Sequence, residues 1–221
     1  WEWDWELAYN FIQNHNPNLI FLCNPNNPTG NYFSKSQIVT LLEKIKSASS
    51  ILVLDEAYID FVTDHQDLYD LVQKYKVILL RSLTKSYGIT GLRLGYSLAN
   101  AEITSQINQY IPPWSVNTLA QNAGIHLFSG NDHIQTGKEI IDKSKNYLIN
   151  ALTDLGYTVE PSNANFILVK VSSAKKMRDS LILRNIIVRD CTSFGLPEHV
   201  RIGIRSIPDC KILIEAIHQV T

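Results

Sequence analysis

Three short runs of uninterrupted apolar residues constrain the fold of this 221-residue chain more than any other feature. They lie at residues 19–22, 51–54 and 77–80, and amphipathic stretches separate them. Strands that are apolar at every position are typical of a parallel sheet that helices cover on both faces. Ser34 and Gln37 form the pattern of a helix-capping box at the start of the first amphipathic stretch. The first half of the chain is therefore predicted to be α/β.

Pro112 and Pro113 mark the predicted boundary between two domains. Neither proline can donate a backbone hydrogen bond, so the helix predicted before them must end there. Beyond this point the pattern predicts a long helical segment at about 118–155, followed by short strands interleaved with helices. We therefore expect one domain at residues 1–112, and a second at 113–221 that consists of the long helix and a small α+β domain.

Composition and charge argue against several classes of protein. Hydrophobic residues make up 45% of the chain and charged residues 19%, and the formal net charge is −1. Such a charge gives no reason to expect a nucleic acid or a membrane surface as partner, and no apolar run approaches the roughly 18 residues of a membrane helix. The three cysteines lack metal-ligand and disulfide spacing, so we expect no metal and a cytoplasmic location.

Polar residues follow the first two apolar runs. Residues 24–30 form a turn rich in Asn, Pro and Gly, and Asp55 and Glu56 directly follow the second run. In open α/β sheets, ligands bind at this carboxyl edge of the strands. Both features also have a purely structural explanation, because Asn, Pro and Gly favour tight turns and an acidic residue can cap the next helix.

The third apolar run leads into the sequence Arg-Ser-Leu-Thr-Lys at 81–85, and Arg93 follows after two glycines. The hydroxyl groups of Ser82 and Thr84, together with the charges of Lys85 and Arg93, are groups that can hold a phosphate. A lone lysine is usually a solvated surface residue. The position of Lys85 at a strand end, among hydroxyls and glycines, favours a functional interpretation.

Arginines gather in the second domain, at Arg189, Arg201 and Arg205. Period-two alternation puts Arg201 and Arg205 on one face of a predicted strand. Their like charges repel each other unless an anion lies between them. Arginines are also common on exposed strand faces, but this repulsion favours a site for a carboxylate or phosphate, which the planar guanidinium binds through two parallel hydrogen bonds.

Three motifs carry a resemblance to a known family: Asn-Asn-Pro-Thr-Gly at 26–30, Asp-Glu-Ala-Tyr at 55–58, and Ser-Leu-Thr-Lys at 82–85 with Gly-Leu-Arg at 91–93. In this order they resemble pyridoxal-phosphate enzymes of the aspartate-aminotransferase fold type. The most similar subgroup contains threonine-phosphate decarboxylase and histidinol-phosphate aminotransferase. The resemblance runs from about Trp5 to the C-terminus. It implies the C-terminal part of a large domain with a mostly parallel sheet, followed by a small α+β domain.

The resemblance implies a role for each matching residue, with pyridoxal 5′-phosphate as the cofactor. Lys85 would form the Schiff base with the cofactor aldehyde, and Asp55 would keep the pyridine nitrogen protonated, so that the ring accepts electrons. These two residues and Tyr58 would be the catalytic residues. Asn27 and Tyr58 would bind the ring hydroxyl. The cofactor phosphate would be bound by Ser82, Thr84 and Arg93. The substrate anion would be bound by Arg201, together with Arg189 and Arg205.

Two stretches, residues 112–117 and 188–196, look like the decarboxylase, and Arg205 stands where the aminotransferase usually has a small residue. Threonine phosphate carries both a carboxylate and a phosphate, so it needs more positive charge than histidinol phosphate. The sequence therefore predicts decarboxylation of L-threonine O-3-phosphate to 1-aminopropan-2-ol phosphate, a precursor of the cobalamin side chain. The alternatives are histidinol-phosphate aminotransferase, which also needs an oxo acid, and a non-catalytic fragment of such an enzyme.

Members of this family carry a long segment before the point that matches Trp5. The resemblance thus implies that this chain is truncated. It would lack part of the phosphate-binding cup, the aromatic residue that stacks on the cofactor ring, and a tyrosine that the neighbouring subunit contributes. We expect a homodimer that acts on a small phosphorylated amino-acid substrate, and weak cofactor binding and turnover for these 221 residues alone.

Overall fold

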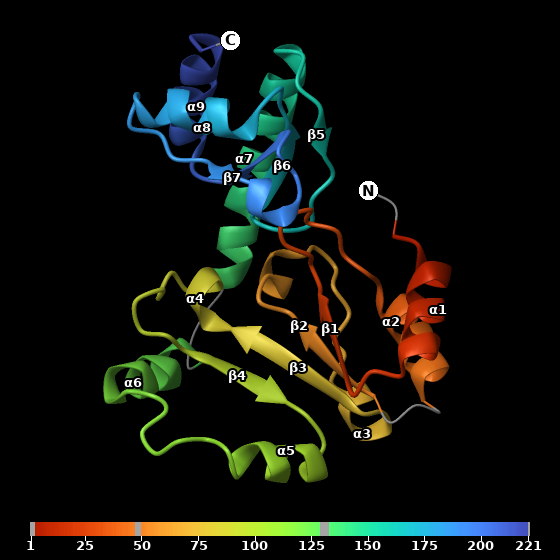
Figure 1. The fold of residues 1–221 in the computed structure, drawn as a ribbon. Coiled ribbons are helices and arrows are strands. Elements are labelled where there is room, and N and C mark those ends of the chain that lie inside the picture. Colours follow the sequence, from red (N-terminus) through yellow and green to blue (C-terminus); the bar gives the residue numbers. More distant parts are fainter. Residues whose placement is uncertain (1–2, 47–49, 129–132, 221) are drawn as a thin grey trace. The chain divides into compact units, whose positions relative to one another are not determined.

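The computed structural model describes residues 3–46, 50–128 and 133–220 (Figure 1). Among them, no helix is both long and apolar enough to cross a membrane.

The chain divides into two compact units. The sheet unit comprises residues 2–25 and 32–132, and the C-terminal unit comprises residues 26–31 and 133–221. This division differs from the predicted boundary after Pro112. The helix that follows the two prolines groups with the sheet unit, and its capping residue donates a hydrogen bond to a backbone oxygen there (Asn117 Nδ2 to Leu92 O, 3.1 Å).

The sheet unit is built on four strands in the order β1-β2-β3-β4 (Figure 1). The first three pair in parallel and the fourth is antiparallel to β3. The predicted α/β fold with a mostly parallel sheet is therefore confirmed. The strands are β1 (Leu19–Cys23), β2 (Ile51–Asp55), β3 (Val77–Ser82) and β4 (Gly95–Leu98).

Helices connect these strands. The capping box that the sequence predicts is present at the start of α2, where Ser34 and Gln37 each accept a hydrogen bond from the other's backbone N–H. The helices of this unit are α1 (Trp5–His15), α2 (Lys35–Ile45), α3 (Leu71–Lys74), α4 (Leu83–Ser86), α5 (Ala101–Asn108) and α6 (Thr118–Leu127), with a short 3-10 helix at Ile59–Phe61.

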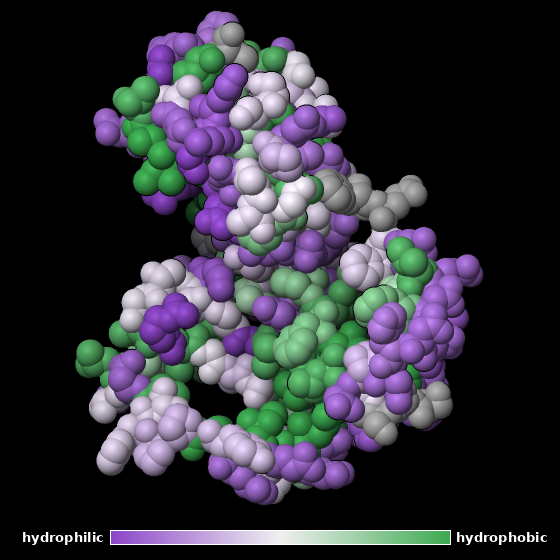
Figure 2. All heavy atoms as spheres, in the orientation of Figure 1, coloured by the Kyte–Doolittle hydropathy of each residue, from purple (hydrophilic) through white to green (hydrophobic). Residues whose placement is uncertain are grey.

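Side-chain alternation separates the two faces of this sheet. Leu54 of β2 and Leu79 of β3 are fully buried in the apolar core that includes the inner face of α2. Asp55 and Ser82 lie an odd number of positions from these leucines, so their side chains project from the opposite face. Figure 2 shows apolar residues on the surface of this unit, and the large side chains it exposes include Phe21 of β1.

The C-terminal unit is the predicted small α+β domain. Its four strands are antiparallel, in the order β5-β6-β8-β7. They are β5 (Val159–Glu160), β6 (Phe166–Lys170), β7 (Arg189–Asp190) and β8 (His199–Gly203). The helices are α7 (His133–Asp154), α8 (Ala174–Ile182) and α9 (Ile207–His218), with a 3-10 helix at Thr192–Phe194.

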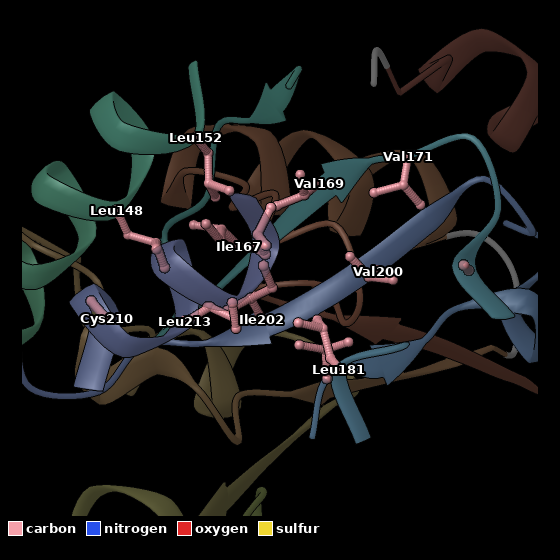
Figure 3. Packing of buried hydrophobic residues seen from close by; sticks show 14 residues of the cluster. Leu148, Leu152, Ile167, Val169, Val171, Leu181, Val200, Ile202, Cys210 and Leu213 are labelled. Carbon is pink, nitrogen blue, oxygen red and sulfur yellow. The ribbon is translucent and has the colours of Figure 1, made fainter. Parts of the chain in front are cut away.

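The long helix predicted at 118–155 corresponds to two helices, α6 and α7. The part of the prediction at residues 129–132 lies outside the described residues. The core of the C-terminal unit forms where α7 meets the sheet, with Leu148 and Leu152 beside Ile167 and Val169 of β6 (Figure 3). This core fixes β8, the strand that carries Arg201 and pairs with β7, which carries Arg189.

Candidate functional site

In the sheet unit, the predicted site residues follow the ends of β2 and β3. Asp55 is the last residue of β2 and is the register partner of Leu80, two positions before Ser82. Because parallel strands end at the same edge of a sheet, their carboxyl ends bring these residues together. The turn that leaves β2 carries Tyr58, and Lys85 lies on α4, the short helix that directly follows β3.

Asp55 is held in a defined orientation. Its carboxylate is partly buried, and Oδ1 accepts a 2.9 Å hydrogen bond from the backbone N–H of Ala57. A carboxylate that is oriented in this way can present Oδ2 to a cationic nitrogen. This geometry fits the predicted partner, a protonated ring nitrogen.

The hydroxyl groups of Ser82 and Thr84 lie 2.7 Å apart, and Thr84 is buried. The backbone N–H of Leu83 donates to the carbonyl oxygen of Leu94 (3.1 Å), which brings the segment that carries Arg93 beside this turn. Arg93 has a positive φ of 60° and an exposed side chain. Two adjacent hydroxyls and a guanidinium on the neighbouring segment are suitable donors for a phosphate.

Lys85 is exposed, and its Nζ lies 5.2 Å from the centre of the Tyr58 ring. At this distance the ammonium group and the face of the ring attract each other. The structure therefore brings Lys85 and Tyr58 together, as their predicted roles on one cofactor require. An accessible amine beside a phenol, in the same segment as the hydroxyls of Ser82 and Thr84, fits a cofactor that carries an aldehyde and a phosphate.

In the C-terminal unit, the turn at 26–31 is held by hydrogen bonds within itself and to the loop before β6. The N–H of Gly30 donates to Asn26 O (2.7 Å), and Gly30 O accepts from the N–H of Asn163 (2.9 Å). Gly30 has a φ of +77°, and a Cβ there would lie 2.0 Å from Ser162 Oγ. Only glycine fits this position without strain.

Arg201 lies on β8, and its neighbours Val200 and Ile202 point into the core. Its Nη1 donates a 2.5 Å hydrogen bond to Oδ1 of Asn27, and its guanidinium lies 5.0 Å from the centre of the Phe166 ring. Asn27 was predicted to bind the cofactor hydroxyl. The structure shows that its amide oxygen is engaged by the predicted substrate-binding arginine.

Arg189 on β7 is the direct cross-strand partner of Arg201. Like charges that face each other across two strands destabilise a sheet. Neutral groups hold the Arg189 side chain: Nη2 donates to the hydroxyl of Ser193 (3.0 Å) and the guanidinium packs 5.5 Å from the centre of the Phe194 ring, while the charge of the neighbouring Asp190 acts on it more weakly. Sequence reasoning found both arginines but did not identify this opposition, which depends on strand pairing.

These two arginines line a cleft of about 780 Å³. Its wall also contains Arg178 of α8 and Asp190, which sequence reasoning missed as a pair because they are remote in sequence. Arg178 Nη1 donates to Asp190 Oδ2 (3.1 Å), and the hydroxyl and N–H of Thr192 donate to Asp190 Oδ1. The hydrogen bonds from Thr192, more than the charge of Arg178, hold the pKa of Asp190 below its usual value. The carboxylate therefore stays ionised and anchors the start of the 3-10 helix.

Arg205 lies apart from the other two arginines. Strand β8 ends at Gly203, and Arg205 pairs with Asp209 of α9 (3.5 Å) while its side chain is 77% exposed. It lines a different, more apolar cleft, together with residues such as Ile212. The alternation that put Arg201 and Arg205 on one strand face therefore does not hold beyond Gly203, and Arg205 has an acidic partner of its own.

Comparisons with known proteins match nearly the whole chain. A family model for aminotransferases of class I and II matches residues 3–217. A histidinol-phosphate aminotransferase from Symbiobacterium thermophilum is 36% identical over 201 residues, which cover 90% of this chain and 55% of that protein. Other curated relatives at 33–36% identity carry the same enzyme name. The chain spans between 52% and 62% of the length of these relatives.

Solved structures agree on the fold. The histidinol-phosphate aminotransferase from Clostridium acetobutylicum is 27% identical, with a TM-score of 0.89 over 96% of this chain and 67% of that one. The L-threonine-O-3-phosphate decarboxylase from Porphyromonas gingivalis is also 27% identical, with a TM-score of 0.84 over 91% of this chain and 64% of that one. A histidinol-phosphate aminotransferase from Sinorhizobium meliloti, solved in complex with pyridoxal-5′-phosphate, is 24% identical, with a TM-score of 0.90 over 99% of this chain and 62% of that one.

Replacing Gly30 with alanine should destabilise the chain more than the same change at Gly156. Both glycines have φ near +80°, but a Cβ at Gly156 meets nothing within 4 Å. Gly156→Ala should therefore cost only the left-handed strain, about 1–2 kcal/mol, whereas Gly30→Ala adds overpacking of about 1–3 kcal/mol. Urea unfolding of the two variants measures this difference, and equal losses would contradict the packing of Gly30 on Ser162.

Proposed function

Because the chain belongs to the aminotransferase class I and II family, we propose that it transfers the amino group of histidinol phosphate to an oxo acid. The observation that carries this proposal is the pair Arg189 and Arg201, which are direct partners across β7 and β8, and neither of which forms an ion pair with the described residues. An anion relieves their repulsion. The phosphate of histidinol phosphate and a carboxylate of the oxo acid can each occupy such a site in turn.

The predicted decarboxylation of threonine phosphate is wrong. The curated relatives at 33–36% identity are named histidinol-phosphate aminotransferases, although two solved structures of the same fold, from Porphyromonas gingivalis and Sulfurospirillum multivorans, are decarboxylases. The structure also removes one physical argument for that prediction. Arg205 was expected to add a cation beside Arg201, but it pairs with Asp209 and lines a separate cleft.

The cofactor is pyridoxal 5′-phosphate, whose ring accepts electrons from the substrate Cα when it is bound. We propose that the Lys85 amine holds it covalently and then moves the proton at the substrate Cα. Asp55 would hold the proton of the ring nitrogen with its oriented carboxylate. Tyr58 would donate to the ring hydroxyl.

The proposed phosphate ligands are Ser82, Thr84 and Arg93. The hydroxyls of Ser82 and Thr84 lie within hydrogen-bonding distance of each other, and the segment that carries Arg93 lies beside them. The amide oxygen of Asn27 accepts from Arg201, so the amide nitrogen is the atom with which Asn27 would donate to the ring hydroxyl. We further propose that the protein acts as a homodimer on a small phosphorylated substrate.

Amine transfer should require both substrates. With pyridoxal phosphate and histidinol phosphate present, we expect amino-acid product only after an oxo acid is added, measured by chromatography of the amino acid. Lys85→Ala should lower the rate by at least about 10²–10⁴-fold, because it removes both the covalent attachment and the proton transfer. Release of carbon dioxide from threonine phosphate without an oxo acid would contradict the proposal.

The three arginines should differ in their effect on substrate binding. Arg189→Ala and Arg201→Ala should each raise the KM of both substrates by about 10–100-fold, because a hydrogen bond to a charged group contributes about 1.5–3 kcal/mol. Arg205→Ala is the matched control, and we expect less than about a threefold change, since exposed ion pairs contribute about 0–1 kcal/mol. Steady-state kinetics measures these KM values, and an increase for Arg205→Ala as large as that for Arg201→Ala would contradict this assignment.

A further inference from the structure

In the core of the sheet unit, the core-facing side chains of β2 and of β3 are apolar, and each of these two rows is followed by a charged residue. Leu54 of β2 is followed two positions later by Glu56, one residue beyond the strand, and Leu79 of β3 is followed two positions later by Arg81. Side chains two positions apart share a face, so this pair continues the core rows. Glu56 is 1% exposed and Arg81 is 8% exposed, and Arg81 Nε donates to Glu56 Oε2 at 2.6 Å.

This ion pair is not arranged for maximal stability. Burial raises the pKa of the Glu56 carboxyl, although the Arg81 charge opposes the rise. Glu56 Oε1 and Arg81 Nη2 are buried without a hydrogen-bond partner in the described part of the chain. A buried ion pair with incomplete hydrogen bonding often contributes no more stability than an apolar pair of similar volume. Its presence at the end of apolar rows therefore points to another role.

Arg81 joins several segments at the end of the sheet. The Tyr69 ring lies 5.4 Å from its guanidinium, and Asp67 lies 3.9 Å from Nη2. Its register partner on β4 is Tyr96. Burial raises the pKa of the Tyr96 hydroxyl, and a hydrogen bond to Tyr69 makes a smaller contribution to that rise. The backbone N–H of Glu56 donates to Leu80 O (2.9 Å). The pair therefore ties the end of β2 to the end of β3, and Arg81 adds contacts to the segment that carries Asp67 and Tyr69.

The residues adjacent to this pair are those proposed to hold the cofactor. Asp55 precedes Glu56, and Ser82 follows Arg81, with their side chains on the opposite face of the sheet. We propose that the Glu56–Arg81 ion pair is a positioning device, which fixes the strand ends from the core side so that Asp55 and the segment 82–85 can bind pyridoxal phosphate. This inference rests on the cofactor roles proposed above.

The test separates cofactor binding from folding. The double variant Glu56→Met/Arg81→Met continues the apolar rows and should keep a thermal unfolding midpoint close to that of the parent. Its dissociation constant for pyridoxal phosphate should rise at least about tenfold, because the ion pair that positions the strand ends is removed. Titration followed by visible absorbance, without substrate, measures this constant. Borohydride trapping of the cofactor on Lys85 should fall in parallel.

The matched control is Lys35→Met/Asp70→Met. This pair has the same 2.6 Å contact in the same unit, but it lies at the surface. We expect no more than about a twofold change in cofactor affinity, since exposed pairs contribute little. Parent-like affinity in Glu56→Met/Arg81→Met, or an equal loss in the control, would overturn the positioning role.

A second variant keeps the test decisive if the double variant does not fold. Arg81→Lys retains both charges but loses the planar fork, so we expect a folded protein with about three- to tenfold weaker cofactor binding. Unchanged affinity in folded Arg81→Lys would also overturn the proposal. All these measurements omit the substrate, so a protein that binds the cofactor but transfers no amine would disprove the proposed reaction and leave this comparison intact.

Discussion

The parallel register of β1, β2 and β3 is the constraint on which the sheet unit depends. Cys23 pairs with Asp55, and Asp55 pairs with Leu80, so three strands end together at one edge. A shift by one residue would turn every side chain to the other face. Asp55 would then enter the core, and Glu56 would take its place. In the observed register Leu54 and Leu79 are fully buried in the core, and Asp55 is kept on the opposite face.

An antiparallel pairing has the equivalent role in the C-terminal unit. It places Arg189 opposite Arg201, and the core residues Val200 and Ile202 hold β8 so that Arg201 projects away from the core. The turn at 26–31 then supplies Asn27 to Arg201 and rests against Ser162 through Gly30. The pairing itself thus makes two positively charged residues direct neighbours, an arrangement that the proposed anion would stabilise.

The sequence was sufficient for features whose physical cause is local. Unbroken apolar runs predicted the parallel strands, and Ser34 with Gln37 predicted the start of α2. It was insufficient where the cause is tertiary. The Glu56–Arg81 pair depends on which strands are neighbours, and Arg205 was misplaced because the chain leaves β8 at Gly203 to enter α9. Motif similarity located the proposed cofactor residues but favoured the wrong reaction.

The central claim is that Lys85 is the residue that holds the cofactor. Its most direct test is to incubate the protein with pyridoxal phosphate, reduce the mixture with borohydride, and map the modified lysine by mass spectrometry of peptides. The structure predicts one dominant modification, at Lys85, which disappears in Lys85→Ala while the other lysines stay unmodified. Modification spread over surface lysines such as Lys35 or Lys74, with none in excess at Lys85, would contradict this account.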